Sequence, residues 1–189
     1  MTEPTHYYWD ACVFIAYLNK EASYGIHLDH IDQFLDDAKA GHTRLYTSSI
    51  TLAEITKLHL KNAQVASFSE FLANFRSAIV PVDPNPIIML KASHLRGMVY
   101  TKTGGKRRLA TPDAIHIATA LTLGDTFNVQ LNALHTFDAG NGKGGAEGPG
   151  LPILGYEEWC EQCDQDEMVK RVIAMKREKP VHPTPRLMK

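Results

Sequence analysis

The stretch YYWDACVFIAYL, residues 7–18, indicates the fold class of this chain. Its three leading aromatic residues form a short apolar run that is typical of a buried strand, and the run stops at Asp10. The apolar segment CVFIAYL follows and predicts a helix. We therefore interpret the stretch as a strand, an acid at the carboxyl end of that strand, and a helix that begins directly after the acid.

The same alternation of strand and helix continues along the chain. Further strands are predicted at 44–49, 79–82 and 133–137, and Pro81 favours an edge position for the second of these. Apolar residues at helical spacing predict the helices at 27–41, 49–60, 65–77 and 86–102. This alternation indicates an α/β domain with a mostly parallel sheet, and ligands of such sheets bind at the carboxyl ends of the strands.

The tripeptide Thr111-Pro112-Asp113 predicts the start of one more helix. Thr111 is the expected N-cap, while a proline and an acid are favoured in the first turn. The helix is expected to continue through AIHIATALTL and to stop at Gly124. Asp113 therefore opens a strongly apolar helix.

Length and composition exclude several classes of protein. The chain has 189 residues, 44% of them hydrophobic and 22% charged, and a formal net charge of -1, which is typical of one globular domain. No apolar run approaches the roughly 18 residues of a membrane span, and the first residues lack the pattern of a secretory signal. Three cysteines, a small and odd number, argue against a disulfide scaffold. We expect a cytoplasmic protein without a membrane-spanning segment.

The C-terminal part differs from the remainder in its charge pattern. Residues 156–167 carry six acids and no Lys or Arg, whereas residues 168–189 carry seven Lys or Arg and one acid. We predict a domain over 1–155 and a helix-prone, charge-segregated extension over 156–189. The basic end of the extension is compatible with binding to phosphates or to an acidic partner, and equally with a solvated tail.

Four acids interrupt apolar surroundings: Asp10, Glu54, Asp113 and Asp138. Each also has a purely structural interpretation. Asp113 fits the dipole of a first helical turn, Asp138 fits a turn after a strand, and Glu54 fits the polar face of a helix. Asp10 is the hardest to explain in this way, because the end of a buried strand solvates a carboxylate poorly.

Four segments in order, YYWDACVFIAYL, TSSITLAEI, LATPDAIHIATAL and ALHTFD, each supply one of these acids. In this order and spacing the chain resembles the PIN-domain nucleases, and among them the VapC-like members, over about residues 7–155. The resemblance implies a three-layer α/β/α domain with a mostly parallel central sheet. It also implies an acidic pocket that holds Mg²⁺ or Mn²⁺ and hydrolyses phosphodiester bonds, usually of RNA, leaving a 5′-phosphate.

The residue types agree with that chemistry. Clustered carboxylates repel one another unless a cation compensates them, and an all-oxygen set favours Mg²⁺ or Mn²⁺ over zinc. Because Mg²⁺ keeps several waters, we expect only Asp10 and Asp113 as direct ligands. Glu54 and Asp138 are then expected to hold metal-bound water or a second ion, and Glu54 is the preferred acceptor for the proton of the attacking water.

The leading hypothesis is a Mg²⁺- or Mn²⁺-dependent endoribonuclease, with the toxin of a type II toxin–antitoxin pair as its specific form. Its expected partners are RNA, an antitoxin that inserts an arginine among the carboxylates, and a second copy in a homodimer. Two alternatives stay open. One is a PIN nuclease that processes RNA or cleaves DNA, and the other is a PIN-type module that binds nucleic acid or protein without cleaving.

Several further residues have two interpretations each. Thr136 is either a carboxylate-orienting hydroxyl or simply a β-branched strand residue. His116, on the helix that Asp113 begins, is interpreted as a packed or partly exposed histidine in preference to a base. The basic run 106–108 either guides phosphates or forms a solvated loop. Ala11 and Cys12 stand where family members often carry hydroxyl or amide side chains.

Two other patterns do not indicate a site. Cys160 and Cys163 form a CxxC, but no second pair completes a zinc site, and the acids around it argue against a lowered thiol pKa. The glycine-rich segment 139–150 lacks the strand–loop–helix context of a phosphate-binding loop and is expected to form a rim over the pocket.

Overall fold

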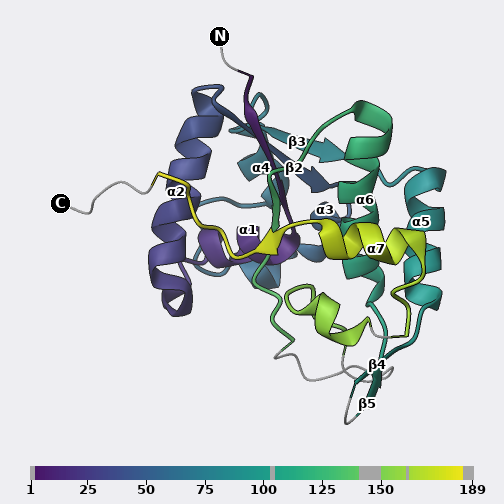
Figure 1. Ribbon diagram of the computed structural model, residues 1–189. Helices are drawn as coiled ribbons and strands as arrows, with labels where there is room; N and C mark the ends of the chain where they lie inside the picture. The colour runs from purple at the N-terminus through teal and green to yellow at the C-terminus, as the bar shows by residue number, and fades with distance from the viewer. Residues whose placement is uncertain (1–2, 103–104, 141–149, 161, 185–189) are drawn as a thin grey trace.

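The structure is a computed structural model that describes residues 3–102, 105–140, 150–160 and 162–184 (Figure 1). Its centre is a five-stranded sheet in the order β3-β2-β1-β6-β7, and every neighbouring pair is parallel. The strands are β1 (Thr5–Trp9), β2 (Thr43–Ser48), β3 (Ile79–Val82), β6 (Ala133–His135) and β7 (Arg177–Glu178). The mostly parallel α/β fold predicted from the sequence is confirmed, as is the edge position of the strand that contains Pro81.

Strand β1 separates two apolar cores because its side chains alternate between the faces of the sheet. Tyr7 and Trp9 point into one core and Tyr8 into the other. The first core is covered by α1 (Ala11–Leu18), α2 (Gly25–Lys39) and α4 (Phe68–Ala73), and the second by α5 (Pro86–Gly97), α6 (Thr111–Phe127) and α7 (Glu167–Ala174). Figure 1 shows α2 on one side of the sheet and α5 and α6 on the other. Helices therefore flank both faces.

The helix predicted at 49–60 is wrong as a single helix. The chain forms a short helix, α3 (Thr51–Glu54), and then a 3-10 turn, η2 (Lys57–Leu60). Ile55 is extended between them, with φ -86° and ψ 91°, and Thr56 and His59 begin the second turn with a capping box. Burial of Ile55 in the first core outweighs the helical spacing. As a result Glu54 lies at the end of its helix.

Other boundaries also differ from the predictions. The helix predicted to reach residue 102 ends at Gly97, and Tyr100–Lys102 (β4) pairs with Gly105–Arg107 (β5) in an antiparallel hairpin. The N-cap of α6 is Ala110, not Thr111, and this helix continues past Gly124 to Phe127. Asn128 ends it in the left-handed conformation, with φ +52°.

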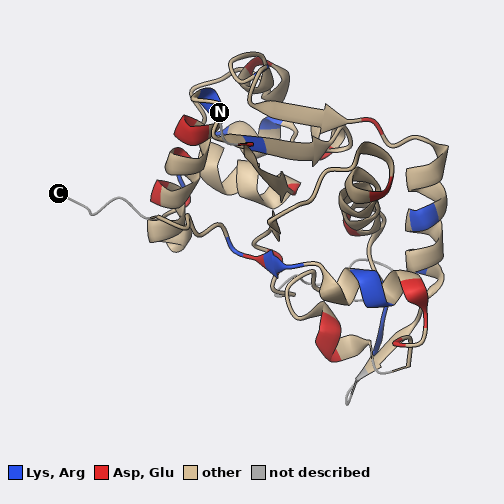
Figure 2. Ribbon diagram, turned by 45° about the horizontal axis from the view of Figure 1, so that its top comes forward, with Lys and Arg blue, Asp and Glu red and all other residues tan. Residues whose placement is uncertain are grey.

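The predicted extension packs on the rest of the chain. It forms a 3-10 turn, η3 (Tyr156–Trp159), then α7 and the edge strand β7, which pairs with β6. Val169 and Val172 are fully buried in the second core. Figure 2 shows basic and acidic residues close together along α7 and the strand after it. The division of the chain at residue 155 stays a prediction.

None of the helices in the described part of the chain is long and apolar enough to cross a membrane.

Candidate active site

Two of the predicted acids lie at neighbouring strand ends. Asp10 follows β1 directly, and Asp138 follows β6 after two intervening residues. The strands pair in parallel with Trp9 opposite His135, so both acids lie at the carboxyl edge of the sheet. This is the edge at which parallel sheets bind ligands.

All four predicted acids line one pocket of about 340 Å³. Glu54 reaches it from the end of α3 and Asp113 from the first turn of α6. Among the residues that the structure describes, no Lys or Arg lines this pocket. Within the same residues, no three His, Cys, Asp or Glu side chains converge closely enough to hold a metal ion together. The acids therefore share a cavity without forming a compact ligand cage.

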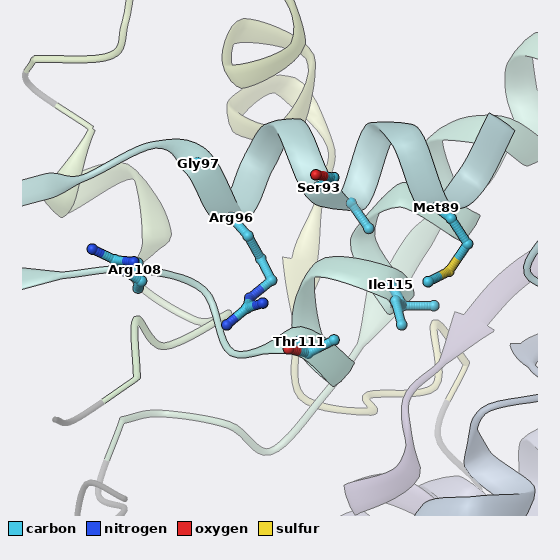
Figure 3. Close-up of a pocket in the computed structure, with 8 residues that line it drawn as sticks. Met89, Ser93, Arg96, Gly97, Arg108, Thr111 and Ile115 are labelled. Carbon is cyan, nitrogen blue, oxygen red and sulfur yellow. The ribbon is translucent and has the colours of Figure 1, made fainter. Parts of the chain in front are cut away.

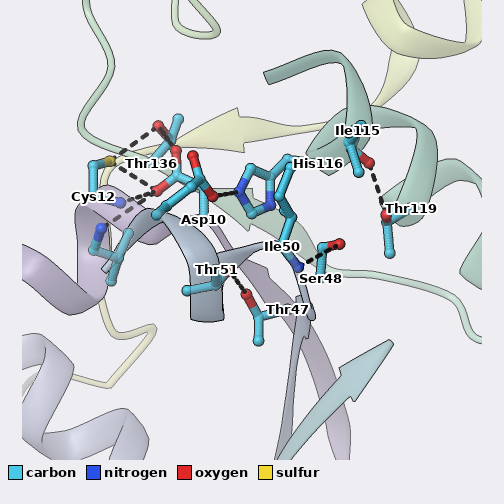
Figure 4. Close-up of polar contacts among 12 residues, drawn as sticks. Asp10, Cys12, Thr47, Ser48, Ile50, Thr51, Ile115, His116, Thr119 and Thr136 are labelled. Atoms are coloured by element: carbon cyan, nitrogen blue, oxygen red, sulfur yellow. Dashed lines mark hydrogen bonds and ion pairs between the residues drawn. The ribbon is translucent and has the colours of Figure 1, made fainter. Parts of the chain in front are cut away.

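Asp10 is held in one orientation by four donors. Its Oδ1 accepts the backbone N–H of Cys12 at 3.1 Å and of Val13 at 3.3 Å, and it also accepts the Cys12 thiol at 2.8 Å. The hydroxyl of Thr136 donates to the second oxygen (Figure 4). The carboxyl is 4% exposed, and burial raises its pKa despite these hydrogen bonds. Thr136 thus orients a carboxylate, and that carboxylate belongs to Asp10.

Glu54 is held by a buried histidine. The Nε2 atom of His116 lies 2.8 Å from a carboxylate oxygen of Glu54, and its Nδ1 atom lies 2.7 Å from the Tyr8 hydroxyl. When the tyrosine donates to Nδ1, the Nε2–H donates to Glu54. His116 is 2% exposed, so it is a packed residue, as the sequence favoured. Its contact with Glu54 was not predicted, because the two residues are 62 positions apart.

Asp113 is half-buried among the charges of the other acids. Burial raises its pKa to about 7, and the negative charges of Asp138, Asp10 and Glu54 add to the shift, while His116 opposes it. Negative charge therefore accumulates in this pocket beyond what its neighbours neutralise.

Asp138 accepts backbone hydrogen bonds as well as lining the pocket. One of its oxygens accepts the backbone N–H of Gly140 at 3.1 Å, and the other accepts that of Ile153 at 2.9 Å. The Thr136 hydroxyl also accepts the N–H of Asp138 at 3.0 Å. The contacts of Asp138 agree with its interpretation as a turn residue. Each of its oxygens has a further lone pair that can accept another hydrogen bond or bind a cation. The predicted rim falls mainly on residues 141–149, which lie outside the described residues.

Two other polar residues line the pocket without having been predicted to do so. Cys12 was noted only as a departure from the family pattern, and its thiol contacts Asp10. His59 lies in η2, within a segment whose spacing suggested an ordinary helix. For Cys12, its position two residues after Asp10 was the one sequence signal that could have placed it in the pocket. The sequence around His59 contains no such signal.

The remaining candidates have structural contacts. Arg107 stacks on the Trp159 ring at 4.5 Å, so it is not a free guide for phosphates. Cys160 and Cys163 are both free thiols, and burial raises the pKa of Cys160 to about 12. The prediction that no thiol pKa is lowered here is confirmed.

Comparison with known families agrees with this geometry. Residues 7–140 match the family model described as PIN domain. The matched range contains all four acids. No curated protein matches the chain significantly.

Proposed function

The chain belongs to the PIN domain family, and from this membership we propose that it is a divalent-metal-dependent endoribonuclease that acts at the acid pocket. PIN domains are generally nucleases, which are hydrolases that act on nucleic acid, and they usually use divalent metal ions. The metal, the preference for RNA and the roles of the individual acids are the proposed part.

The donor chemistry of the pocket supports a hard cation. Its acids offer carboxylate oxygens, which suit Mg²⁺ or Mn²⁺, and only two protein ligands are needed when the ion keeps its waters. We assign Asp10 and Asp113 as those ligands. When bound, the cation would polarise the scissile phosphate and lower the pKa of the attacking water.

The protein's own residues then have distinct roles. Thr136 and the first turn of α1 fix the orientation of Asp10, so little reorganisation is needed on binding. His116 directs Glu54, which we propose as acceptor of the water proton. Asp138 is proposed to hold a water or a second ion while it accepts the N–H of Ile153.

The single observation that carries this proposal is the negative charge gathered around Asp113 without a Lys or Arg in the described lining. Uncompensated carboxylates in a partly buried site reduce stability, and a cation would remove that cost. The alternative of a binding module without cleavage does not need this charge.

The test is cleavage of a mixed-sequence single-stranded RNA in Mn²⁺ and in EDTA. Wild type should cut only with metal, and Asp113→Asn should not cut. Asp125→Asn, on the same helix but outside the pocket, is the matched control and should cut normally. Cleavage of single-stranded DNA in place of RNA would assign the alternative substrate, and metal-independent or absent cleavage would contradict the proposal.

The VapC-like resemblance extends the proposal to a toxin with an antitoxin partner. Such an inhibitor would place an arginine in the acid pocket, where charge-assisted hydrogen bonds are strong. A homodimer and a cytoplasmic location belong to the same proposal, and the three free cysteines agree with a reducing compartment. The mass of the purified chain in solution tests the dimer.

A further inference from the structure

One polar side chain of the acid pocket has no part in the proposed metal site. His59 lies in η2, just beyond the break at Ile55 that also places Glu54 at the end of α3. Both residues therefore reach the same pocket from one short segment of the chain. His59 is half-buried, so part of its surface stays accessible to a molecule bound in the pocket.

The turn that carries His59 is fixed at three points. Leu60 is buried in the first core, and the side chain of Asn19, the C-cap residue of α1, donates to the backbone carbonyl of His59 at 2.7 Å. The capping box supplies the third point, because the backbone N–H of Thr56 donates to the Nδ1 atom of His59 at 3.2 Å. The imidazole is thus oriented before a ligand binds, which lowers the entropic cost of binding.

These contacts decide which ring nitrogen of His59 carries the proton. An Nδ1 atom that accepts a backbone N–H has no proton of its own, so the proton of the neutral ring is on Nε2. The Thr56 hydroxyl lies 3.4 Å from the same Nδ1 atom, and no described residue is hydrogen-bonded to Nε2. His59 therefore offers the pocket an N–H donor. A metal ion binds a lone pair instead, so this tautomer argues against His59 as a ligand of the cation.

His59 supplies the one side-chain N–H of the described lining that has no partner. The other imidazole, that of His116, uses both of its nitrogens for hydrogen bonds within the protein. The Cys12 thiol donates to Asp10. The remaining polar side chains of this lining are carboxyl groups, which only accept hydrogen bonds when they are ionised. Among these side chains, a ligand rich in oxygen acceptors meets its donor at His59.

Two basic residues near the start of α6 belong to a different pocket. That pocket has a volume of about 450 Å³, lies between α5 and the start of α6, and is lined by Arg96 and Arg108 (Figure 3). Thr111 and Ile115 of α6 also line it, whereas Asp113 lines the acid pocket. The two pockets thus lie on different sides of α6, and these guanidinium groups do not line the acid pocket.

We propose that His59 binds the substrate through its Nε2–H, which donates to a non-bridging oxygen of the phosphate that lies in the acid pocket. A phosphodiester has more than one non-bridging oxygen, so another remains for the proposed metal site. The hydrogen bond is strengthened by the charge of the phosphate, and it acts where the carboxylates repel that charge. This inference rests on the proposed function, since it names a further contact with the same substrate.

Two substitutions separate the donor of His59 from its contact with the turn. In His59→Asn the side-chain oxygen takes the place of Nδ1 and can still accept the N–H of Thr56, but no atom reaches the position of Nε2. In His59→Gln the amide nitrogen takes the place of Nε2 and keeps a donor, whereas the acceptor for Thr56 is lost. A role in RNA binding and a role in the turn therefore predict opposite orders for the two variants.

Binding is measured in a Glu54→Gln background with Mn²⁺, by the fluorescence anisotropy of a labelled single-stranded RNA of about 12 nucleotides. This background lacks the proposed proton acceptor and keeps the proposed metal ligands. His59→Asn should weaken binding roughly tenfold, as expected for one hydrogen bond to a charged group, and His59→Gln by about threefold or less. His42→Asn is the control: His42 is exposed just before β2, at the opposite end of the strands from the acid pocket, and its loss should leave binding unchanged.

Three results would overturn the proposal. The first is equal binding by His59→Asn and the background. The second is a larger loss in His59→Gln than in His59→Asn, which would show that the residue acts through the turn. The third concerns the rise in melting temperature with Mn²⁺, which should be the same in His59→Asn and wild type. Loss of this rise in His59→Asn would assign His59 to the metal.

The two proposals fail in different ways. RNA binding that depends on His59, together with no Mn²⁺-dependent cleavage by wild type, would remove the nuclease function and keep this contact. Mn²⁺-dependent cleavage by wild type, together with binding that is indifferent to His59, would do the reverse. Failure of the background to bind RNA at all would overturn the contact.

Discussion

The two ends of α6 carry aspartates in opposite surroundings. At the first turn, burial and the charges of neighbouring acids raise the pKa of Asp113 to about 7. Near the last turn, burial alone would raise the pKa of Asp125, but hydrogen bonds and charge from Lys91 and Arg171 outweigh it and lower the pKa. The two cations lie 2.6 Å and 2.5 Å from the Asp125 oxygens.

The difference separates a charge that the fold neutralises from one that it leaves without a partner of opposite sign. Asp125 joins α6 to α5 and to α7, so its charge is neutralised by the elements that it connects. Asp113 faces other acids, an arrangement that costs stability and that a fold alone does not need. Sites of this kind persist where activity requires them.

Neutralising each aspartate in turn gives the largest expected contrast. Asp113→Asn should reduce RNA cleavage by roughly 1,000-fold, equivalent to about 4 kcal/mol, because the proposed metal site loses a ligand. Its melting temperature should stay the same or rise, since a repelled charge is removed. Asp125→Asn should keep full cleavage. Initial cleavage rates and thermal melting curves of the two variants test these expectations. Equal losses of activity in Asp113→Asn and Asp125→Asn would contradict a special role for the first turn of α6.

A divalent cation should stabilise only the acidic end. Binding to the folded state at about 100 times Kd contributes about 2.7 kcal/mol, which is a rise of roughly 5 to 10 °C for a domain of this size. Wild type and Asp125→Asn should show this shift with Mn²⁺ in differential scanning fluorimetry, and Asp113→Asn should lose most of it. A similar rise in all three proteins would indicate binding elsewhere.

Loss of the His116 contact should have a smaller effect. His116→Gln should reduce cleavage by roughly 10- to 100-fold, because Glu54 is no longer directed by the imidazole. It should also raise the Mn²⁺ concentration needed for half-maximal rate, which a purely structural defect would not do. His94→Gln is the control: His94, on α5, pairs at 2.8 Å with Asp166, the N-cap of α7, does not line the acid pocket, and its loss should leave cleavage unchanged.

Lowering the pH should reduce the free energy of unfolding through Asp125, and this is the smallest of the expected effects. Because folding lowers the pKa of Asp125, its ion pairs stabilise the protein above the ordinary value of 3.8 and lose their contribution as pH falls through the lowered value. The Asp125 side chain is 35% exposed, so the contribution is below about 1 kcal/mol. Chemical denaturation of wild type and Asp125→Asn should differ at pH 7 and converge near pH 2. A constant difference across this range would contradict the pairing.

Much of the fold follows from local patterns in the sequence. The apolar run before Asp10 and the one before Asp138 were both predicted as strands, and both form strands. These two strands pair in parallel, so the acids that follow them lie at the same edge of the sheet. The roles of these acids stay predictions, but their common pocket follows from the order of the strands.

Features that depend on long-range packing could not be predicted. Strand β7 is two residues, Arg177–Glu178, within a charged run that carries no strand signal. This segment is a strand because it pairs with β6, and the local sequence alone does not favour that conformation. Arg96 and Arg108 share a pocket only because α5 packs against α6. The break at Ile55 likewise reflects burial rather than propensity.

The hydrogen bond from Thr136 to Asp10 spans 126 residues of chain, and this separation sets an order of events during synthesis. At about 5 to 20 residues per second, the ribosome adds Thr136 roughly 6 to 25 s after Asp10. Until then the strand that contains Asp10 has no β6 beside it and the acid pocket has no Asp138. The acid pocket is therefore incomplete until synthesis has passed Asp138, whatever the speed at which the earlier part of the chain folds.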